Sequence, residues 1–274
     1  MLDKLAKNLG TLKQEFVKTY DGHSHIQEII PSCSSEFFPI DESHLKLLHK
    51  FIEKNPIYHN SYEKKIADTL CTVYEGDINE YWLNSIKHGS SCQPFYPTWV
   101  ISAYIATSIA KNLQYKELID IGSGDGRIAY CAKILDLQAT SIEIDDVLVE
   151  LQNDILSSTN INFNPVCADA IEFDYSTLNL SFPVFFIGGL PQMGGDVLAK
   201  NIIDKISTTK LKKNTCIVFA GTHSKRQLSG NQSIGGWSSL IDSHSLQVIK
   251  TVLLPTIWTF DQISDTPYIY TKFK

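Results

Sequence analysis

Three glycines and two aspartates lie close together near the middle of the chain, in the order Asp120-Ile121-Gly122-Ser123-Gly124-Asp125-Gly126-Arg127. The segment begins where a short apolar run ends and leads into a helical pattern. Its glycines let the backbone turn sharply and let a ligand approach bare backbone. The dinucleotide fingerprint has the spacing GxGxxG, whereas this loop has GxGxG. Asp120 and Asp125 would repel a pyrophosphate and suit a positively charged ligand, such as an α-ammonium or sulfonium group. The alternative is a tight turn that binds nothing.

Two further acidic residues follow the next two predicted strands. Glu143 lies at the end of the run from Ala139 to Ile144, where in a βαβ unit an acidic residue lies close to the ribose hydroxyls of a bound adenosine. Asp169 follows the run from Asn162 to Cys167, where its carboxylate would accept a hydrogen bond from an adenine amino group. Taken alone, Asp169 is equally well explained as a helix cap. Together, the three strand ends predict a site for adenosine attached to a cationic group.

Three segments, Glu117 to Ile128, Ser141 to Asp145 and Cys167 to Ala170, resemble the cofactor motifs of class I, seven-strand S-adenosylmethionine-dependent methyltransferases. The resemblance covers about residues 94 to 274. It implies a Rossmann-like, doubly wound α/β fold, whose mostly parallel seven-strand sheet has an antiparallel final strand. It also implies S-adenosyl-L-methionine as the cofactor, S-adenosyl-L-homocysteine as its product, and no metal. The cofactor-binding residues that it implies are Asp120, Gly122, Ser123, Gly124, Asp125 and Gly126 in the first motif, Glu143 and Ile144 in the second, and Asp169 and Ala170 in the third.

A narrower resemblance concerns the kind of acceptor. Pro94-Phe95-Tyr96-Pro97-Thr98-Trp99 is similar to the segment ahead of the first motif in archaeal seven-strand protein-lysine methyltransferases and in histone-lysine methyltransferases without a SET domain. These families also favour the Asp-Gly-Arg found at residues 125–127. The resemblance implies that Tyr96, Pro97 and Thr98 border the methionine end of the cofactor and that a protein lysine accepts the methyl group. The alternative is that Pro97 and Thr98 simply begin a helix.

The acceptor is expected beside the segment from Ile187 to Gly195, after the fourth predicted strand. Enzymes that methylate bases or amides resemble one another in an Asn-Pro-Pro-Tyr type motif here. This chain lacks the motif, which argues against such acceptors. The acceptor-site candidates are Tyr96, Gly188, Gly189, Leu190 and Pro191. No dedicated base is predicted, because desolvation in an aromatic channel lowers the pKa of a lysine amine. Besides Tyr96, the aromatic candidates for the channel wall, or alternatively for the core, are Trp99, Trp237 and Trp258.

Composition narrows the classes of partner. The chain has 274 residues, a formal net charge of -6 and 24 basic residues. Only Arg127 and Arg226 are arginines, and this scarcity argues against a nucleic-acid substrate. No apolar run approaches the roughly 18 residues of a membrane span, and the first residues lack the pattern of a secretory signal, so a cytoplasmic protein without a membrane anchor is expected. Six scattered cysteines without a CxxC pair predict reduced thiols and no zinc site. His23 and His25 are likewise expected to be solvated rather than metal-bound.

The elements that must position these residues fall into two regions. Residues 1–92 are predicted to form a helical N-terminal extension or lid, with helices over 1–16, 41–55, 61–74 and 78–86 and an irregular stretch over 22–39. Residues 93–274 are predicted to form the S-adenosylmethionine-binding methyltransferase domain, because short apolar runs alternate with helical patterns. The expected strands cover 117–121, 139–144, 162–167, 183–187 and 215–220, the expected helices cover 98–113, 126–135, 146–156 and 195–206, and 246–254 and 268–273 are expected to form a terminal antiparallel pair.

These observations favour a methyltransferase that transfers a methyl group in line from S-adenosylmethionine to a protein lysine. Two alternatives stay open. One is a small-molecule methyltransferase in which residues 1–92 close over a metabolite. The other is a module that binds the cofactor without catalysis. A nucleotide-dependent dehydrogenase is disfavoured by the loop spacing.

Overall fold

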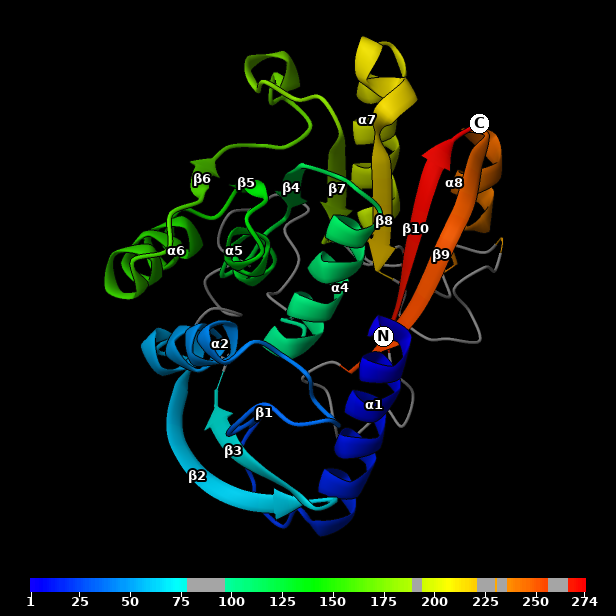
Figure 1. Ribbon diagram of the computed structural model, residues 1–274. Coiled ribbons are helices and arrows are strands. Elements are labelled where there is room, and N and C mark those ends of the chain that lie inside the picture. The colour runs from blue at the N-terminus through cyan, green and yellow to red at the C-terminus, as the bar shows by residue number, and fades with distance from the viewer. Residues whose placement is uncertain (78–96, 189–193, 221–229, 231–235, 256–265) are drawn as a thin grey trace.

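The computed structural model describes residues 1–77, 97–188, 194–220, 230, 236–255 and 266–274 (Figure 1). Its centre is a seven-stranded sheet with the order β6-β5-β4-β7-β8-β10-β9. The strands are β4 (Glu117–Ile121), β5 (Gln138–Glu143), β6 (Asn164–Cys167), β7 (Pro183–Ile187), β8 (Cys216–Ala220), β9 (Leu246–Leu254) and β10 (Thr266–Phe273). The strands from β4 to β8 pair in parallel, whereas β10 is antiparallel to both β8 and β9. The predicted Rossmann-like sheet with an antiparallel final strand is confirmed.

Helices cover both faces of this sheet. Leu118 and Val184 pack on the face of α4 (Val100–Asn112), α5 (Arg127–Ile134) and α6 (Asp146–Thr159). Ile119 and Phe185, the next residues along the same strands, pack on the face of α7 (Gly195–Ser207) and α8 (Ser238–Ser243). Because successive side chains of a strand point to opposite faces, central strands of this kind are apolar on both sides. By the same alternation, the side chain of Asp120 belongs to the α5 face.

The N-terminal region adds a second, smaller sheet. It comprises α1 (Leu2–Thr19), β1 (Ile26–Pro31), α2 (Glu42–Lys54), β2 (Tyr58–Ile66) and β3 (Thr69–Gly76), and its strands form an antiparallel sheet with the order β1-β3-β2. Figure 1 shows this sheet below the large one, with α1 beside β9 and α2 beside α5 and α6. Buried residues of the N-terminal region share one hydrophobic core with those of α4, α5 and α6.

The prediction of a helical N-terminal extension is therefore wrong in part. The predicted helices at 1–16 and 41–55 are confirmed as α1 and α2, but residues 61–74 form the β2–β3 hairpin and the stretch over 22–39 contains β1. Ala67 and Asp68 have φ values of 44° and 64°, and two consecutive left-handed residues form the turn that suits a tight hairpin. Leu70 fits a helical stripe in sequence, yet it is 46% exposed on the hairpin. The predicted helix over 78–86 lies outside the described residues.

The order of the strands changes direction at β4. From β4 the chain continues to β5 and β6 on one side, and then to β7 and β8 on the other. Ligands of open α/β sheets bind outside the carboxyl ends of the strands at such a change of direction. The glycine loop directly follows β4, so it lies at this point. Among the described residues, no helix combines the length and the apolar character needed to cross a bilayer.

Candidate functional site

The glycine loop, residues 122–126, joins the end of β4 to the start of α5. Gly122, Gly124 and Gly126 have φ values of 65°, 57° and 77°, a left-handed conformation that other residues adopt at a cost. A Cβ atom added to Gly126 would come within 2.8 Å of the Phe163 ring, whereas one added to Gly122 would meet no atom of the other described residues within 4 Å. Gly126 is therefore packed against the protein, and Gly122 borders open space.

Asp120 lies on β4, two residues before Gly122, and is only 3% exposed. Its Oδ2 atom has no hydrogen-bond partner within the described part of the chain. Burial raises the pKa of Asp120 well above its ordinary value, and the nearby carboxylates of Glu143 and Asp125 raise it further. Buried acceptors without a donor are uncommon in proteins. This one fits a ligand that brings a donor or a positive charge.

Glu143 ends β5 and ties that strand to the glycine loop. Its Oε2 accepts a hydrogen bond from the Gly124 N–H at 2.8 Å, and its Oε1 accepts from the N–H groups of Ile144 and Asp145 at 2.9 and 3.1 Å. Burial raises the pKa of Glu143, although these three N–H groups favour its carboxylate form. A carboxylate has about four acceptor positions, so the side chain keeps capacity for a ligand hydroxyl. Ile144 beside it is 41% exposed and offers an apolar surface at the tip of the strand.

The third predicted motif lies next to the second. The N–H of Ala168 donates to the carbonyl of Glu143 at 2.9 Å, which brings residues 168–170 to the tip of β5. Asp169 is exposed, and its Oδ1 accepts from the Ile171 N–H at 2.8 Å. It therefore closes a local turn and not the start of a helix, and its exposure leaves it open to a ligand. Ala170 is buried.

Sequence reasoning missed a glutamine that holds the glycine loop from α6. Gln152 is fully buried. Its Nε2 donates to the Gly124 carbonyl at 2.7 Å and to the Ser123 hydroxyl at 3.0 Å, and its Oε1 accepts from the Ser141 hydroxyl at 2.6 Å. One amide thus fixes the loop against β5 and α6. The sequence signal that could have revealed it is a polar residue on the same helical face as Leu148 and Ile155, where an unpaired amide would be costly.

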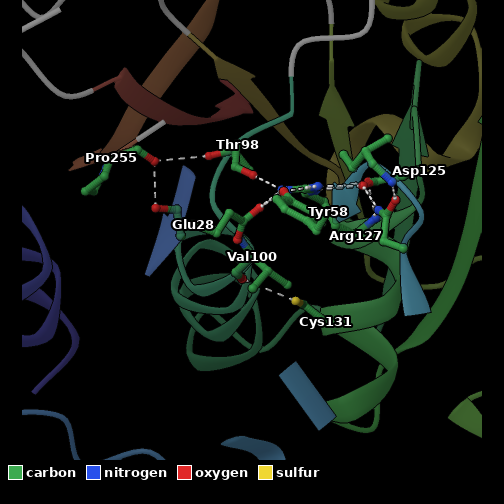
Figure 2. Close-up of polar contacts among 11 residues, drawn as sticks. Glu28, Tyr58, Thr98, Val100, Asp125, Arg127, Cys131 and Pro255 are labelled. Carbon is green, nitrogen blue, oxygen red and sulfur yellow. Dashed lines mark hydrogen bonds and ion pairs between the residues drawn. The ribbon is translucent and has the colours of Figure 1, made fainter. Parts of the chain in front are cut away.

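Asp125, which the sequence resemblance places among the cofactor ligands, is paired with an arginine of its own chain. Its carboxylate accepts from Nε of Arg127 at 2.9 and 3.1 Å (Figure 2). The side-chain amide of Asn55 donates to the same carboxylate at 2.8 Å. All three residues are buried. The carboxylate of Asp125 therefore serves the structure of the loop, and only its backbone remains a candidate for ligand contact.

The segment ahead of α4 is held by the same arginine. The carbonyl of Thr98 accepts a hydrogen bond from Arg127, and the Thr98 hydroxyl donates to the carbonyl of Pro255 at 3.3 Å (Figure 2). α4 begins at Val100, whose N–H donates to Oε2 of Glu28 at 2.7 Å. The segment thus leads into a helix, but Pro97 and Thr98 lie before its first residue, and Trp99 is its N-cap. It also contacts the arginine of the Asp-Gly-Arg sequence that accompanies it in the narrower resemblance.

Gly188 is the one acceptor-site candidate among the described residues. Its N–H donates to the carbonyl of Ile121 at 2.7 Å, and a Cβ atom at this position would come within 2.5 Å of the Gly122 carbonyl oxygen. The end of β7 and the glycine loop therefore touch, and only glycine permits so close an approach. The other acceptor-site candidates, Tyr96, Gly189, Leu190 and Pro191, lie outside the described residues, and so does the contact predicted between Tyr96 and the cofactor.

Two of the candidate channel walls belong to the core. Trp99 and Trp237 are fully buried, and the indole N–H of Trp237 donates to the carbonyl of Ala220 at 3.0 Å. Trp258 lies outside the described residues. Within the ranges that the structure describes, no group of three or more His, Cys, Asp or Glu side chains is arranged to hold a metal ion. The described cysteines are free thiols: Cys33, Cys71, Cys131, Cys167 and Cys216.

Comparison with known proteins gives a likeness in structure and none in sequence. No protein-family model matches the chain, and no curated protein matches it significantly. The structure reported for the conversion of a disulfide bond into a thioacetal group during echinomycin biosynthesis has a TM-score of 0.51 and 13% identity, over 70% of this chain and 92% of that chain. At this level of identity the likeness concerns the fold alone.

Two further solved structures are similar over a smaller share of their own length. The mitomycin 7-O-methyltransferase MmcR has a TM-score of 0.47 and 14% identity, over 64% of this chain and 54% of that chain. MtNAS, solved in complex with MTA and tNA, has a TM-score of 0.43 and 11% identity, over 63% of this chain and 60% of that chain. The chain thus spans less than two thirds of the length of either protein.

Proposed function

We propose that this protein is an S-adenosylmethionine-dependent methyltransferase. The observation that carries the proposal is the buried Oδ2 of Asp120, which has no hydrogen-bond partner among the described residues and belongs to the residue two positions before Gly122, at the carboxyl end of β4. The sheet changes direction at this strand, where ligands of α/β folds bind. A buried carboxyl group without a donor favours a ligand that carries N–H groups or a positive charge. The α-ammonium group of S-adenosylmethionine provides both.

The surrounding residues fit the rest of that cofactor. Asp120 and the backbone of the glycine loop would hold its methionine end, and Glu143 would accept from its ribose hydroxyls. The exposed side chains of Ile144 and Asp169 would border the adenine ring. Carboxyl groups predominate among the buried charged groups near the loop, and opposite charges attract strongly where water is excluded. The site therefore suits a sulfonium compound and disfavours a pyrophosphate.

When bound, S-adenosylmethionine supplies a methyl group already activated by its sulfonium. The task of the protein is to hold the acceptor in line with that methyl group, about 3 Å away, and to exclude water. The glycine loop lies against Gly188 on one side and, through Arg127, against Thr98 on the other. We expect these segments to orient the acceptor. A lysine amine that loses its water there has a lowered pKa, so no dedicated base is required.

We propose a protein lysine as the acceptor. The two segments that resemble those of protein-lysine methyltransferases, residues 94–99 and 125–127, meet in the hydrogen bond from Arg127 to the Thr98 carbonyl. This contact supports the view that they act together. The net charge of -6 and the scarcity of arginine support a cationic acceptor over a nucleic acid. The free cysteines support a reducing, cytoplasmic location.

The test is a labelling experiment with the purified chain, methyl-labelled S-adenosylmethionine and a heat-treated native lysate. We expect label in the protein fraction, released on hydrolysis as methylated lysine. Glu143→Ala is the control variant, and it should lose the label because its ribose contact is gone. Label confined to the small-molecule fraction would identify a metabolite methyltransferase. Calorimetric binding of the cofactor without label in any fraction would identify a non-catalytic module, and the absence of binding would refute the proposed site.

A further inference from the structure

A buried ion pair joins the N-terminal sheet to the start of α5. Glu28 lies on β1 and Arg127 is the first residue of α5, and their side chains are 0% and 3% exposed. Oε1 of Glu28 accepts from Arg127 and, at 2.5 Å, from the hydroxyl of Tyr58 on β2 (Figure 2). Its Oε2 accepts from the N–H of Val100 at 2.7 Å. A single carboxylate therefore connects β1 and β2 with the first residues of α4 and α5.

Arg127 extends this connection into the glycine loop. Its Nε donates to Oδ1 of Asp125 at 2.9 Å, and a terminal nitrogen donates to Oδ2 at 2.5 Å. Asp125 is the residue between Gly124 and Gly126. Asn55, which follows α2, donates to the same carboxylate at 2.8 Å. The N-terminal region thus holds the loop twice, through Glu28 by way of Arg127 and through Asn55 directly.

The glycine loop is the part of this arrangement whose backbone has the most alternative conformations, because three of its five residues are glycines. A buried charge that loses one of its partners is costly, so the surrounding structure rearranges to restore the pairing or to admit water. Glycines with left-handed backbone have the widest choice of alternative conformations. Without the charge of Glu28, Arg127 would keep Asp125 as its only charged partner in this cluster. A shift of that pair would displace the Gly124 N–H from Glu143, at the tip where the ribose is expected.

We propose that Glu28 and Arg127 are positioning residues of the cofactor site, and that residues 1–77 are an integral part of this site rather than a detachable lid. Glu28 acts through Arg127 and Asp125 on the backbone of the glycine loop, and it does not touch the reacting atoms. In naming S-adenosylmethionine as the ligand, the inference rests on the proposed function. The hold of the N-terminal sheet on the loop can be measured without any ligand.

The test compares two glutamate-to-glutamine variants of the full-length protein. Glu28→Gln removes the charge that faces Arg127. Glu117→Gln is the matched control, because Glu117 is also buried and its carboxylate accepts from Ser181 N–H, Ser181 hydroxyl and Phe182 N–H at 3.2, 2.7 and 2.8 Å. Glu117 begins β4 at the end opposite the glycine loop. Each variant replaces a buried carboxylate that accepts hydrogen bonds, but only the carboxylate of Glu28 is connected to the glycine loop.

Two quantities are measured in wild type and in both variants: amide hydrogen exchange of residues 122–127 without ligand, and calorimetric affinity for S-adenosylmethionine. In Glu28→Gln we expect affinity to be about tenfold weaker, because a ligand that needs the ordered loop binds in proportion to its population. A tenfold loss requires the loop to be open in most molecules, so its amide exchange should become nearly as fast as that of an unstructured segment. In Glu117→Gln we expect neither change. Equal effects in both variants would overturn the proposal, because they would reflect a general loss of stability. Wild-type exchange in Glu28→Gln would also overturn it.

A milder variant keeps the test decisive if Glu28→Gln does not fold. Tyr58→Phe removes only the hydroxyl that donates to Glu28 and lies 3.3 Å from a terminal nitrogen of Arg127. Amide exchange of the loop should be faster and affinity for S-adenosylmethionine weaker, each by a smaller factor than in Glu28→Gln. Unchanged exchange of the loop would count against the proposal. If the wild-type protein bound no S-adenosylmethionine, the proposed function would fail, and the exchange comparison would still decide whether the N-terminal sheet orders the loop.

Discussion

Replacing Gly122 by alanine should separate the stability of the protein from its affinity for the cofactor. The added methyl group would meet no atom within 4 Å in the part of the chain that the structure describes, so it creates no clash there. The φ value of 65° is the source of the cost, and the left-handed conformation costs a residue with a Cβ atom about 1–2 kcal/mol. For a chain of this size, such a loss lowers the melting temperature by about 2–4 °C.

Cofactor affinity should fall for a reason separate from the loss of stability. The methyl group would point into the space that we assign to S-adenosylmethionine, so we expect at least about tenfold weaker binding, or 1.4 kcal/mol. Urea unfolding and titration calorimetry measure the two effects separately. Gly188→Ala is the comparison, because its Cβ atom would come within 2.5 and 2.8 Å of the carbonyl oxygens of Gly122 and Ile121. It should therefore lose more stability than Gly122→Ala. Wild-type affinity in a folded Gly122→Ala protein would refute the assignment of this space to the cofactor.

Two more predictions concern residues that face the same loop. Burial raises the pKa of Asp120, so this group stabilises the fold fully below about pH 4 and the contribution is lost as the pH rises through the raised pKa. Asp120→Asn cannot ionise. The ligand-free variant should therefore be more stable than wild type in urea unfolding at about pH 8, and should bind S-adenosylmethionine at least about tenfold more weakly; a less stable variant would contradict this account. Gln152→Ala removes the bonds to Ser123, Gly124 and Ser141, and should lower the free energy of unfolding by about 1–3 kcal/mol, with faster amide exchange in the loop as the check.

The sequence predicted best those elements whose signals lie in neighbouring residues of the chain. β4 and β7 occupy the predicted residues 117–121 and 183–187, because each is a short apolar run bounded by turn residues. α2 begins after Asp41, whose carboxylate accepts from the Ser43 N–H at 2.8 Å, as the capping preference expects. The glycine loop could be placed for the same reason, since its residues and the strand before it are contiguous in sequence.

Sequence reasoning failed where contacts between residues far apart in the chain decide the conformation, and where the spacing of apolar residues fits both a helix and a strand. Tyr62, Ile66 and Leu70 are spaced as on a helix, but the turn at 67–68 and the pairing of β3 with β1 and β2 make a sheet of this segment. Tertiary pairing overrides a weak local preference in such cases. In the candidate site, sequence did not indicate that the Asp125 carboxylate accepts a hydrogen bond from Asn55, which lies 70 residues away. No local pattern indicates such a contact.

Arg127 shows that composition can carry a signal that periodicity does not. The chain has 24 basic residues, of which two are arginines, so lysine serves nearly every position where a positive charge alone is needed. Arg127 donates in several directions at once, to Asp125, Glu28, the Thr98 carbonyl and the Tyr58 hydroxyl. A guanidinium has five N–H donors in a rigid plane, whereas an ammonium group has three on a single atom. Lysine could not meet these partners together, which is why an arginine in a lysine-rich chain points to a buried site with several acceptors.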